Sequence, residues 1–179
     1  MPVAHDRYSP AAVEHPTPAL QVIRDVTAQP GVMTPEGLYG PLLVGSTMHT
    51  RFIEFPAGLY CIEHALPVES MVYTVRGRWV LTSQGSRTVM AAQSLAHFPA
   101  NVPKGFEIPF EEPALLLVLR AEATTAEDIW RYLLEDMRPM LQQRIHAGQL
   151  VFQLAELPAD HPARLFAAQV NPSRWGGGG

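Results

Sequence analysis

The segment from Gly58 to Gly77, GLYCIEHALPVESMVYTVRG, is bounded by two glycines and divided by a proline, and this pattern constrains the fold more than any other feature. Apolar and β-branched residues alternate with other residues over 51–55 and again over 71–75, which is typical of strands. Pro67 breaks the run between them, and a glycine at each end suits a tight connection that needs positive φ. The segment therefore predicts a strand, a turn and a strand.

The same spacing resembles the first motif of the cupin superfamily, G-x5-H-x-H-x3/4-E-x6-G. Counting from Gly58, His64 stands at the first histidine, Leu66 at the second, Ser70 at the glutamate and Gly77 at the closing glycine. The resemblance implies a small single-domain cupin in which most of the usual metal-ligand positions hold other residues.

The second cupin motif, G-x5-P-x-G-x2-H-x3-N, aligns on Gln93, Pro99, Asn101, Lys104 and Ile108. Only the proline is retained in type. Asn101 stands at a glycine position, and asparagine tolerates the left-handed conformation that glycine would adopt there.

The resemblance covers residues 45–120 and implies an all-β fold, a single cupin-type jelly-roll β-barrel. Further strands are expected over 78–82, 88–90 and 114–119. We predict one domain in three parts: an N-terminal arm over 1–44, the barrel core over 45–121, and a C-terminal helical segment with a flexible tail over 122–179.

The two ends of the chain differ from its middle. Many prolines and glycines precede residue 45, so we expect an arm with short strands that packs on a neighbouring subunit. Thr124 and Glu127 resemble a capping box, which predicts a helix that Pro139 kinks or ends. Its apolar face packs on the barrel exterior or forms a dimer contact, and consists of Ile129, Trp130, Leu133, Leu134, Met137 and Leu141. Trp175 and the glycines after it resemble a flexible tail.

Composition excludes several classes of protein. The chain has 179 residues, 47% hydrophobic and 17% charged, as expected for one globular domain. A net charge of −4 without a basic cluster argues against nucleic acid as a partner. No apolar run is long enough for a membrane span, and the N-terminus lacks a signal-like segment, which predicts a cytoplasmic protein. The single cysteine, Cys61, excludes an internal disulfide. We expect a homodimer that binds a small molecule.

Strand alternation puts every second residue on one face, and the cupin resemblance implies that this face is the barrel interior. The residues expected inside are Tyr60, Ile62, His64, Leu66, Ser70, Val72, Thr74, Lys104 and Phe106. Arg51 and His97 are further candidates for the same substrate-binding pocket. Glu63 and Tyr73 have the opposite parity and are expected outside.

Three residues are candidates for catalysis. His64 would transfer a proton, with Glu69 or Lys104 as its partner. Glu69 reaches the interior only if the turn around Pro67 shifts, and is otherwise a carboxylate at the rim. Lys104 would hold an anionic or carbonyl group, and burial would lower its pKa. The alternatives are a hydrogen-bonded core histidine at position 64 and a solvated lysine at position 104.

No metal or other cofactor is predicted. The assignable ligand positions hold His64, Leu66, Ser70 and Lys104; leucine cannot ligate a metal and a protonated lysine repels a cation. The alternative is an iron, manganese, nickel or zinc site in a different register, in which His64 and Glu69 are joined by His49, Glu54 or His97.

Three functions remain open. The first is a metal-independent enzyme of isomerase, lyase, dehydratase or cyclase type that uses acid–base chemistry on a small polar metabolite. The second is a non-catalytic binding or sensory barrel, and the third is a non-haem metal-dependent dioxygenase with shifted ligands. We favour the first, because a binding barrel has no need of a paired acid and base.

Overall fold

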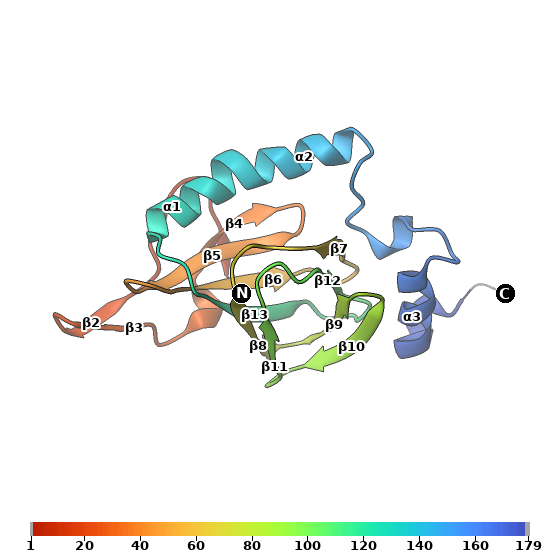
Figure 1. Cartoon of the computed structure of the whole chain (residues 1–179), viewed down its shortest axis with the longest axis horizontal. Helices are drawn as coiled ribbons and strands as arrows, with labels where there is room; N and C mark the ends of the chain where they lie inside the picture. The colour runs from red at the N-terminus through yellow and green to blue at the C-terminus, as the bar shows by residue number, and fades with distance from the viewer. Residues whose placement is uncertain (1, 178–179) are drawn as a thin grey trace.

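The computed structural model describes residues 2–177 and consists of two facing sheets with helices at one side and one end (Figure 1). A seven-stranded sheet contains, in spatial order, β1 (Val3–Ala4), β4 (Pro30–Thr34), β5 (Gly37–Val44), β6 (His49–Phe55), β13 (Ala114–Arg120), β8 (Ser70–Arg76) and β11 (Leu95–Phe98). A four-stranded sheet contains β10 (Ser86–Ala91), β9 (Arg78–Ser83), β12 (Lys104–Glu107) and β7 (Tyr60–His64).

The two sheets enclose a common apolar core. Phe55 on β6 lies against Phe106 on β12, with ring centroids 5.0 Å apart, and Trp79 on β9 stacks on the same Phe106 at 5.3 Å. Side chains of both sheets belong to one cluster of buried residues. This arrangement is a jelly roll, so the prediction of an all-β jelly-roll fold is confirmed.

The segment that led to the prediction folds as expected at its ends. Gly58 and Gly77 both have positive φ, at 87° and 78°, and a Cβ on Gly77 would collide with the backbone of Pro113. Asn101 also takes the left-handed conformation, with a φ of 63°. On β8 the expected alternation is present, because Ser70, Val72 and Thr74 are buried and the residues between them are not.

The first part of the chain contributes strands to the main sheet. β4 pairs with β5, and β5 pairs with β6, so residues 30–44 extend the same sheet as the strands that follow residue 45. Before them, β2 (Glu14–Thr17) and β3 (Leu20–Val22) form a hairpin that projects from the body of the molecule (Figure 1), followed by the short 3₁₀ helix η1 (Val26–Ala28). Only this earlier stretch has the form of an arm.

A long helical segment lies across β4 and β5 (Figure 1) and consists of α1 (Ala126–Arg131), the π-helix η2 (Tyr132–Met137) and α2 (Arg138–His146). The cap is Thr125 rather than Thr124, because the Thr125 side chain accepts from the Asp128 backbone N–H. The π-helix ends just before Pro139, where the helix departs from regular α geometry but continues.

The apolar face of this segment joins the core that the two sheets share. Ile129, Trp130, Leu133 and Leu141 are buried in the same cluster as Val72 and Phe106. Its side chains therefore complete the protein's own interior and close one end of it, instead of packing only on the outside of the barrel.

The C-terminal part packs beside the four-stranded sheet and contains η3 (Leu154–Glu156), α3 (Pro162–Val170) and α4 (Pro172–Trp175). The Trp175 indole donates to the Pro109 carbonyl at 2.7 Å, so Trp175 is anchored rather than part of a tail. Gly178 and Gly179 lie outside the described residues. None of the helices in residues 2–177 has the length and apolar character needed to cross a bilayer.

Candidate functional site

A cavity of about 530 Å³ lies between the two sheets, under the helical segment. Both sheets line it, and Tyr132, Met137, Met140 and Leu141 of the helical segment cover it. The volume is in the range of small-molecule sites. The interior expected from strand alternation is therefore partly filled by the apolar core and partly hollow.

Most of the predicted substrate-binding residues line this cavity. Arg51, Leu66, Ser70, Val72 and Phe106 all contribute to its wall. Their contact with a substrate stays a prediction. Strand parity placed all of these side chains on the inner face except Arg51, which was a further candidate.

The parity prediction fails on part of β7 because of a bulge. His64 pairs with Lys104, and Cys61 pairs with Phe106, so β7 has one more residue than β12 between these two pairs. Cys61, Glu63 and His64 consequently all line the cavity, although Glu63 was expected outside. Ile62 also contributes to the wall, as predicted, with 55% of its surface still exposed. Tyr60 points away from the cavity and packs edge-on against His161 at 5.4 Å. The sequence gives no direct sign of this bulge.

Lys104 is the most unusual side chain in the cavity. It is only 3% exposed, and its Nζ has no hydrogen-bond partner among residues 2–177. The Nζ lies over the face of the Phe98 ring, 5.4 Å from its centroid. Burial lowers the pKa of Lys104. Lys104 is also the only lysine in the chain, which the sequence already shows and which sets it apart from ordinary surface lysines.

His64 lies on the neighbouring strand, directly opposite Lys104 in the pairing of β7 with β12. Its Nδ1 is 3.2 Å from the Ile62 carbonyl, which can only accept, so Nδ1 carries the proton in the neutral ring. Nε2 is then the basic nitrogen.

Glu69 and His97 do not belong to this site. The Glu69 carboxylate is 2.6 Å from His97 Nε2, and the two side chains are 57% and 49% exposed. The turn around Pro67 does not shift β8, so Glu69 keeps the parity opposite to that of Ser70 and points to solvent. Placement of Glu69 beside His64, and of His97 in the pocket, is therefore wrong.

Sequence reasoning missed a polar group at another side of the cavity. The Tyr39 hydroxyl donates to Glu36 Oε2 at 2.7 Å, and Cys61 Sγ lies 3.6 Å from Glu36 Oε1. Burial and the neighbouring carboxylate raise the pKa of both Tyr39 and Cys61, which keeps both groups protonated at neutral pH. Glu36 and Tyr39 lie in the segment expected to be an arm, so they were not considered for the interior.

The cavity wall also contains two arginines that the sequence analysis did not predict, in addition to Arg51. Arg120 lines the wall together with Arg51, and Arg144 approaches from the helical segment. Burial lowers the pKa of Arg120, although a guanidinium stays charged at any ordinary pH. Alternation along 114–120 places Arg120 on the same face as Leu116 and Val118, so an extension of that strand by one residue would have found it.

The residues present do not fit a metal ion. In the part of the chain that the structure describes, no three His, Cys, Asp or Glu side chains are grouped so that they could hold one. The alternative metal site in a different register also lacks ligands, since Glu69 and His97 lie outside the cavity and Glu54 is bound by Arg76 at 2.7 Å. Lys104 and Arg51 place positive charge where a cation would lie.

Comparison with solved structures identifies the fold. A protein assigned as ethanolamine utilization protein Q (EutQ) from Salmonella typhimurium LT2 matches with a TM-score of 0.54 at 13% identity, over 64% of this chain and 95% of that one. An RmlC-like cupin from Shewanella frigidimarina NCIMB 400 matches with a TM-score of 0.48 at 19% identity, over 55% and 86% of the two chains. KdgF from Halomonas sp. matches with a TM-score of 0.47 at 14% identity, over 53% and 86%.

At these identities the likeness extends to the fold and no further. No protein-family model matches the sequence, and no curated protein matches it significantly. The function must therefore be argued from the cavity itself.

Proposed function

Because the chain has the cupin fold, we propose that its cavity is the active site of a small-molecule enzyme that works by acid–base chemistry. The reaction is of the isomerase, lyase, dehydratase or cyclase type, each of which moves a proton on carbon or oxygen in a water-poor pocket. The residues that carry it are His64 and Lys104. Glu69, which is outside the cavity, has no part in it.

The observation that supports this proposal is the state of Lys104. Burying a cation without a partner costs several kcal/mol of folding free energy, and a well-packed apolar residue at the same position would avoid that cost. Lys104 is in that position, because it is 3% exposed and its Nζ has no hydrogen-bond partner in the part of the chain that the structure describes. Such a group is explained by a ligand atom that accepts from it in the working protein.

The two residues divide the work in the following way. His64 Nε2 is the basic nitrogen and takes the proton from the substrate. The Lys104 ammonium, on the strand paired with His64, stabilises the negative charge that develops on the substrate oxygen. The lowered pKa of Lys104 also lets the ammonium give a proton to the product, after which protonated His64 on the paired strand returns its proton to the lysine.

Hydrogen exchange on a panel of small 2-oxo, 3-oxo and 3-hydroxy carboxylates in D₂O, followed by proton NMR, tests this proposal. The wild-type protein is expected to exchange the C–H adjacent to the carbonyl of at least one compound without added metal. His64→Gln should abolish that exchange but still bind the compound. His97→Gln, outside the cavity, is the matched control and should exchange normally.

The other candidate functions predict different results in the same experiment. A binding or sensory barrel would bind a compound without exchanging any C–H. A metal enzyme would exchange or oxidise a compound only after addition of iron, manganese, nickel or zinc, and would retain the metal in elemental analysis. Either result would overturn the acid–base proposal.

A further inference from the structure

Positive charge gathers at one end of the interior, on two neighbouring strands. His49 and Arg51 lie on β6, two residues apart and therefore on the same face, and His49 pairs directly with Arg120 on β13. Directly paired side chains on one face lie within about 5.5 Å of each other at Cβ. Arg51 itself pairs with Val118, so Arg51 and Arg120 are diagonal neighbours on the inner wall, about 7 to 8 Å apart.

These side chains are buried without the partners that such groups normally have. Arg51 is 6% exposed and His49 2% exposed, and Arg51 Nε, Arg120 Nε and His49 Nε2 all lack a hydrogen-bond partner among residues 2–177. Neither arginine has a carboxylate within 4.0 Å in that part of the chain. Most buried donors in proteins are hydrogen-bonded, so this cluster needs an explanation.

The acidic groups nearby interact with other residues and do not form ion pairs with Arg51 or Arg120. Asp128 binds Arg131 at 2.8 Å and the Thr125 hydroxyl at 2.7 Å. Glu36 accepts from Tyr39. Glu122 lies close enough to favour the charged form of Arg120 but forms no ion pair with it. The cluster therefore keeps a net positive charge.

A second cavity of about 330 Å³ adjoins the first, and Arg51 and Arg120 line both. The two arginines thus lie where the cavities meet and have open space on either side. Guanidinium N–H groups that face a cavity from adjoining strands are well placed to bind the oxygens of a carboxylate or phosphate.

We propose that Arg51 and Arg120 form a binding subsite for an anionic group, carboxylate or phosphate, and that the substrate of this enzyme is accordingly a small organic anion. This inference rests on the proposed function and names its substrate class. His49 Nδ1 lies 3.1 Å from the Glu122 carbonyl, so Nε2 donates only when the ring is protonated, and the subsite depends mainly on the two arginines.

The pairing of strands relates this subsite to the catalytic residues. Arg120 pairs with Ser70 on β8, and Ser70 pairs with Phe98 on β11, the residue whose ring lies under Lys104 Nζ. Two strand spacings are about 10 Å. Arg51, Arg120, Lys104 and His64 also line the same cavity, so a small molecule bound there can place its anionic group toward the arginines and its reacting carbon toward Lys104 and His64.

Calorimetric titration at low ionic strength with inorganic phosphate, and separately with malonate, tests the subsite. At least one probe is expected to bind the wild-type protein, and Arg51→Met and Arg120→Met should each weaken that binding by about tenfold or more. Arg24→Met removes an exposed arginine far from the cavity as a matched control, and should leave binding unchanged. The stronger probe distinguishes a phosphate from a carboxylate ligand.

A second measurement uses only the wild-type protein, in case a variant does not fold. Phenylglyoxal modifies accessible arginines, and peptide mass spectrometry would locate the modified ones. The bound probe should protect Arg51 and Arg120 but not Arg24. Absence of binding by both probes, or binding that neither protects these arginines nor depends on them, would overturn the subsite.

The two proposals can fail separately. Loss of probe binding in the arginine variants without any C–H exchange in the wild-type protein would keep the subsite and reject the acid–base enzyme. C–H exchange that is unaffected by Arg51→Met and Arg120→Met would keep the enzyme and reject the subsite.

Discussion

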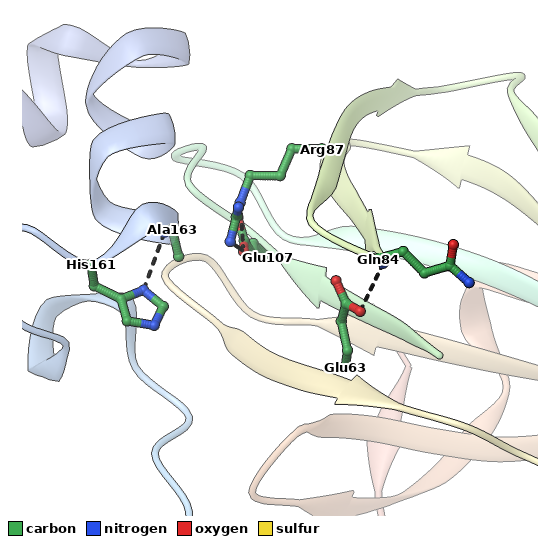
Figure 2. Close-up of polar contacts among 6 residues, drawn as sticks. All are labelled: Glu63, Gln84, Arg87, Glu107, His161 and Ala163. Atoms are coloured by element: carbon green, nitrogen blue, oxygen red, sulfur yellow. Dashed lines mark hydrogen bonds and ion pairs between the residues drawn. The ribbon is translucent and has the colours of Figure 1, made fainter. Parts of the chain in front are cut away.

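The two faces of strand β12 differ in whether their buried charged side chain has a partner. Glu107, at the end of the strand, points outward and is 1% exposed, and Arg87 binds both of its oxygens at 3.0 to 3.3 Å (Figure 2). Lys104, at the start of the same strand, points into the cavity, and its Nζ has no such partner among the described residues. The protein itself neutralises the charge of Glu107, whereas the charge of Lys104 is available to a bound ligand. This contrast separates a structural ion pair from a binding site.

The largest expected effect is on the outer face. Arg87→Met leaves the Glu107 carboxylate buried without its partner, and breaking a buried pair in this way costs about 3 to 5 kcal/mol of unfolding free energy. Burial already raises the pKa of Glu107 in spite of Arg87, so the carboxylate has little further protection from desolvation. Chemical denaturation would measure the loss. A decrease no larger than that of Arg24→Met, which removes an exposed arginine, would show that Arg87 contributes only surface charge.

Inside the cavity, replacing the buried cation is expected to raise the unfolding free energy instead of lowering it. Lys104→Met removes a buried cation that has no hydrogen-bond partner within residues 2–177 and replaces it with an apolar chain of similar length. The change should stabilise the free protein by about 1 to 3 kcal/mol. The same variant should lose the proposed C–H exchange. Arg87→Met makes the matched comparison, because it also replaces a cation next to β12. Destabilisation by both variants would remove the distinction between the two faces.

The increase in unfolding free energy caused by Lys104→Met should also depend on pH. Burial places the pKa of Lys104 below its ordinary value of 10.5, so the unfolded chain binds the proton more tightly than the folded one. The folded wild-type protein therefore becomes more stable as the pH rises from the lowered pKa toward 10.5. Each unit of lowering corresponds to about 1.4 kcal/mol. The difference in unfolding free energy between wild type and Lys104→Met, measured by urea denaturation, should narrow as the pH rises from neutral toward 10.5. A difference that does not change with pH would contradict the prediction.

The same comparison shows what the sequence could reveal. Strand rhythm and the glycines at 58 and 77 predicted the fold class and the inward residues of β8, because side-chain direction follows directly from a regular strand. The bulge in β7 could not be predicted, because it depends on how β7 registers with β12, far away in the sequence. Glu36 and Tyr39 were missed for a similar reason, since only the pairing of β5 with β6 brings them to the interior.

The prediction that Glu69 is the partner of His64 was wrong for a simpler reason. Glu69 was attractive because it is close in sequence to the glutamate of a known motif, but one residue of displacement on a strand puts a side chain on the other face. Lys104 needed no knowledge of neighbours: a single lysine on a strand between apolar residues was visible from the start.

The smallest expected effect concerns that rejected pair. Glu69→Gln removes one partner of an ion pair in which both side chains are about half exposed, and water screens such pairs so that they contribute about 1 kcal/mol or less. The variant should therefore unfold within that range of the wild type and keep both C–H exchange and anion binding. His64→Gln, tested beside it, should lose exchange. If Glu69→Gln also abolished exchange, Glu69 would have to enter the cavity in the working protein, which requires the Pro67 turn to shift when substrate binds and would make the turn, rather than the rigid inner wall, the element that completes the site.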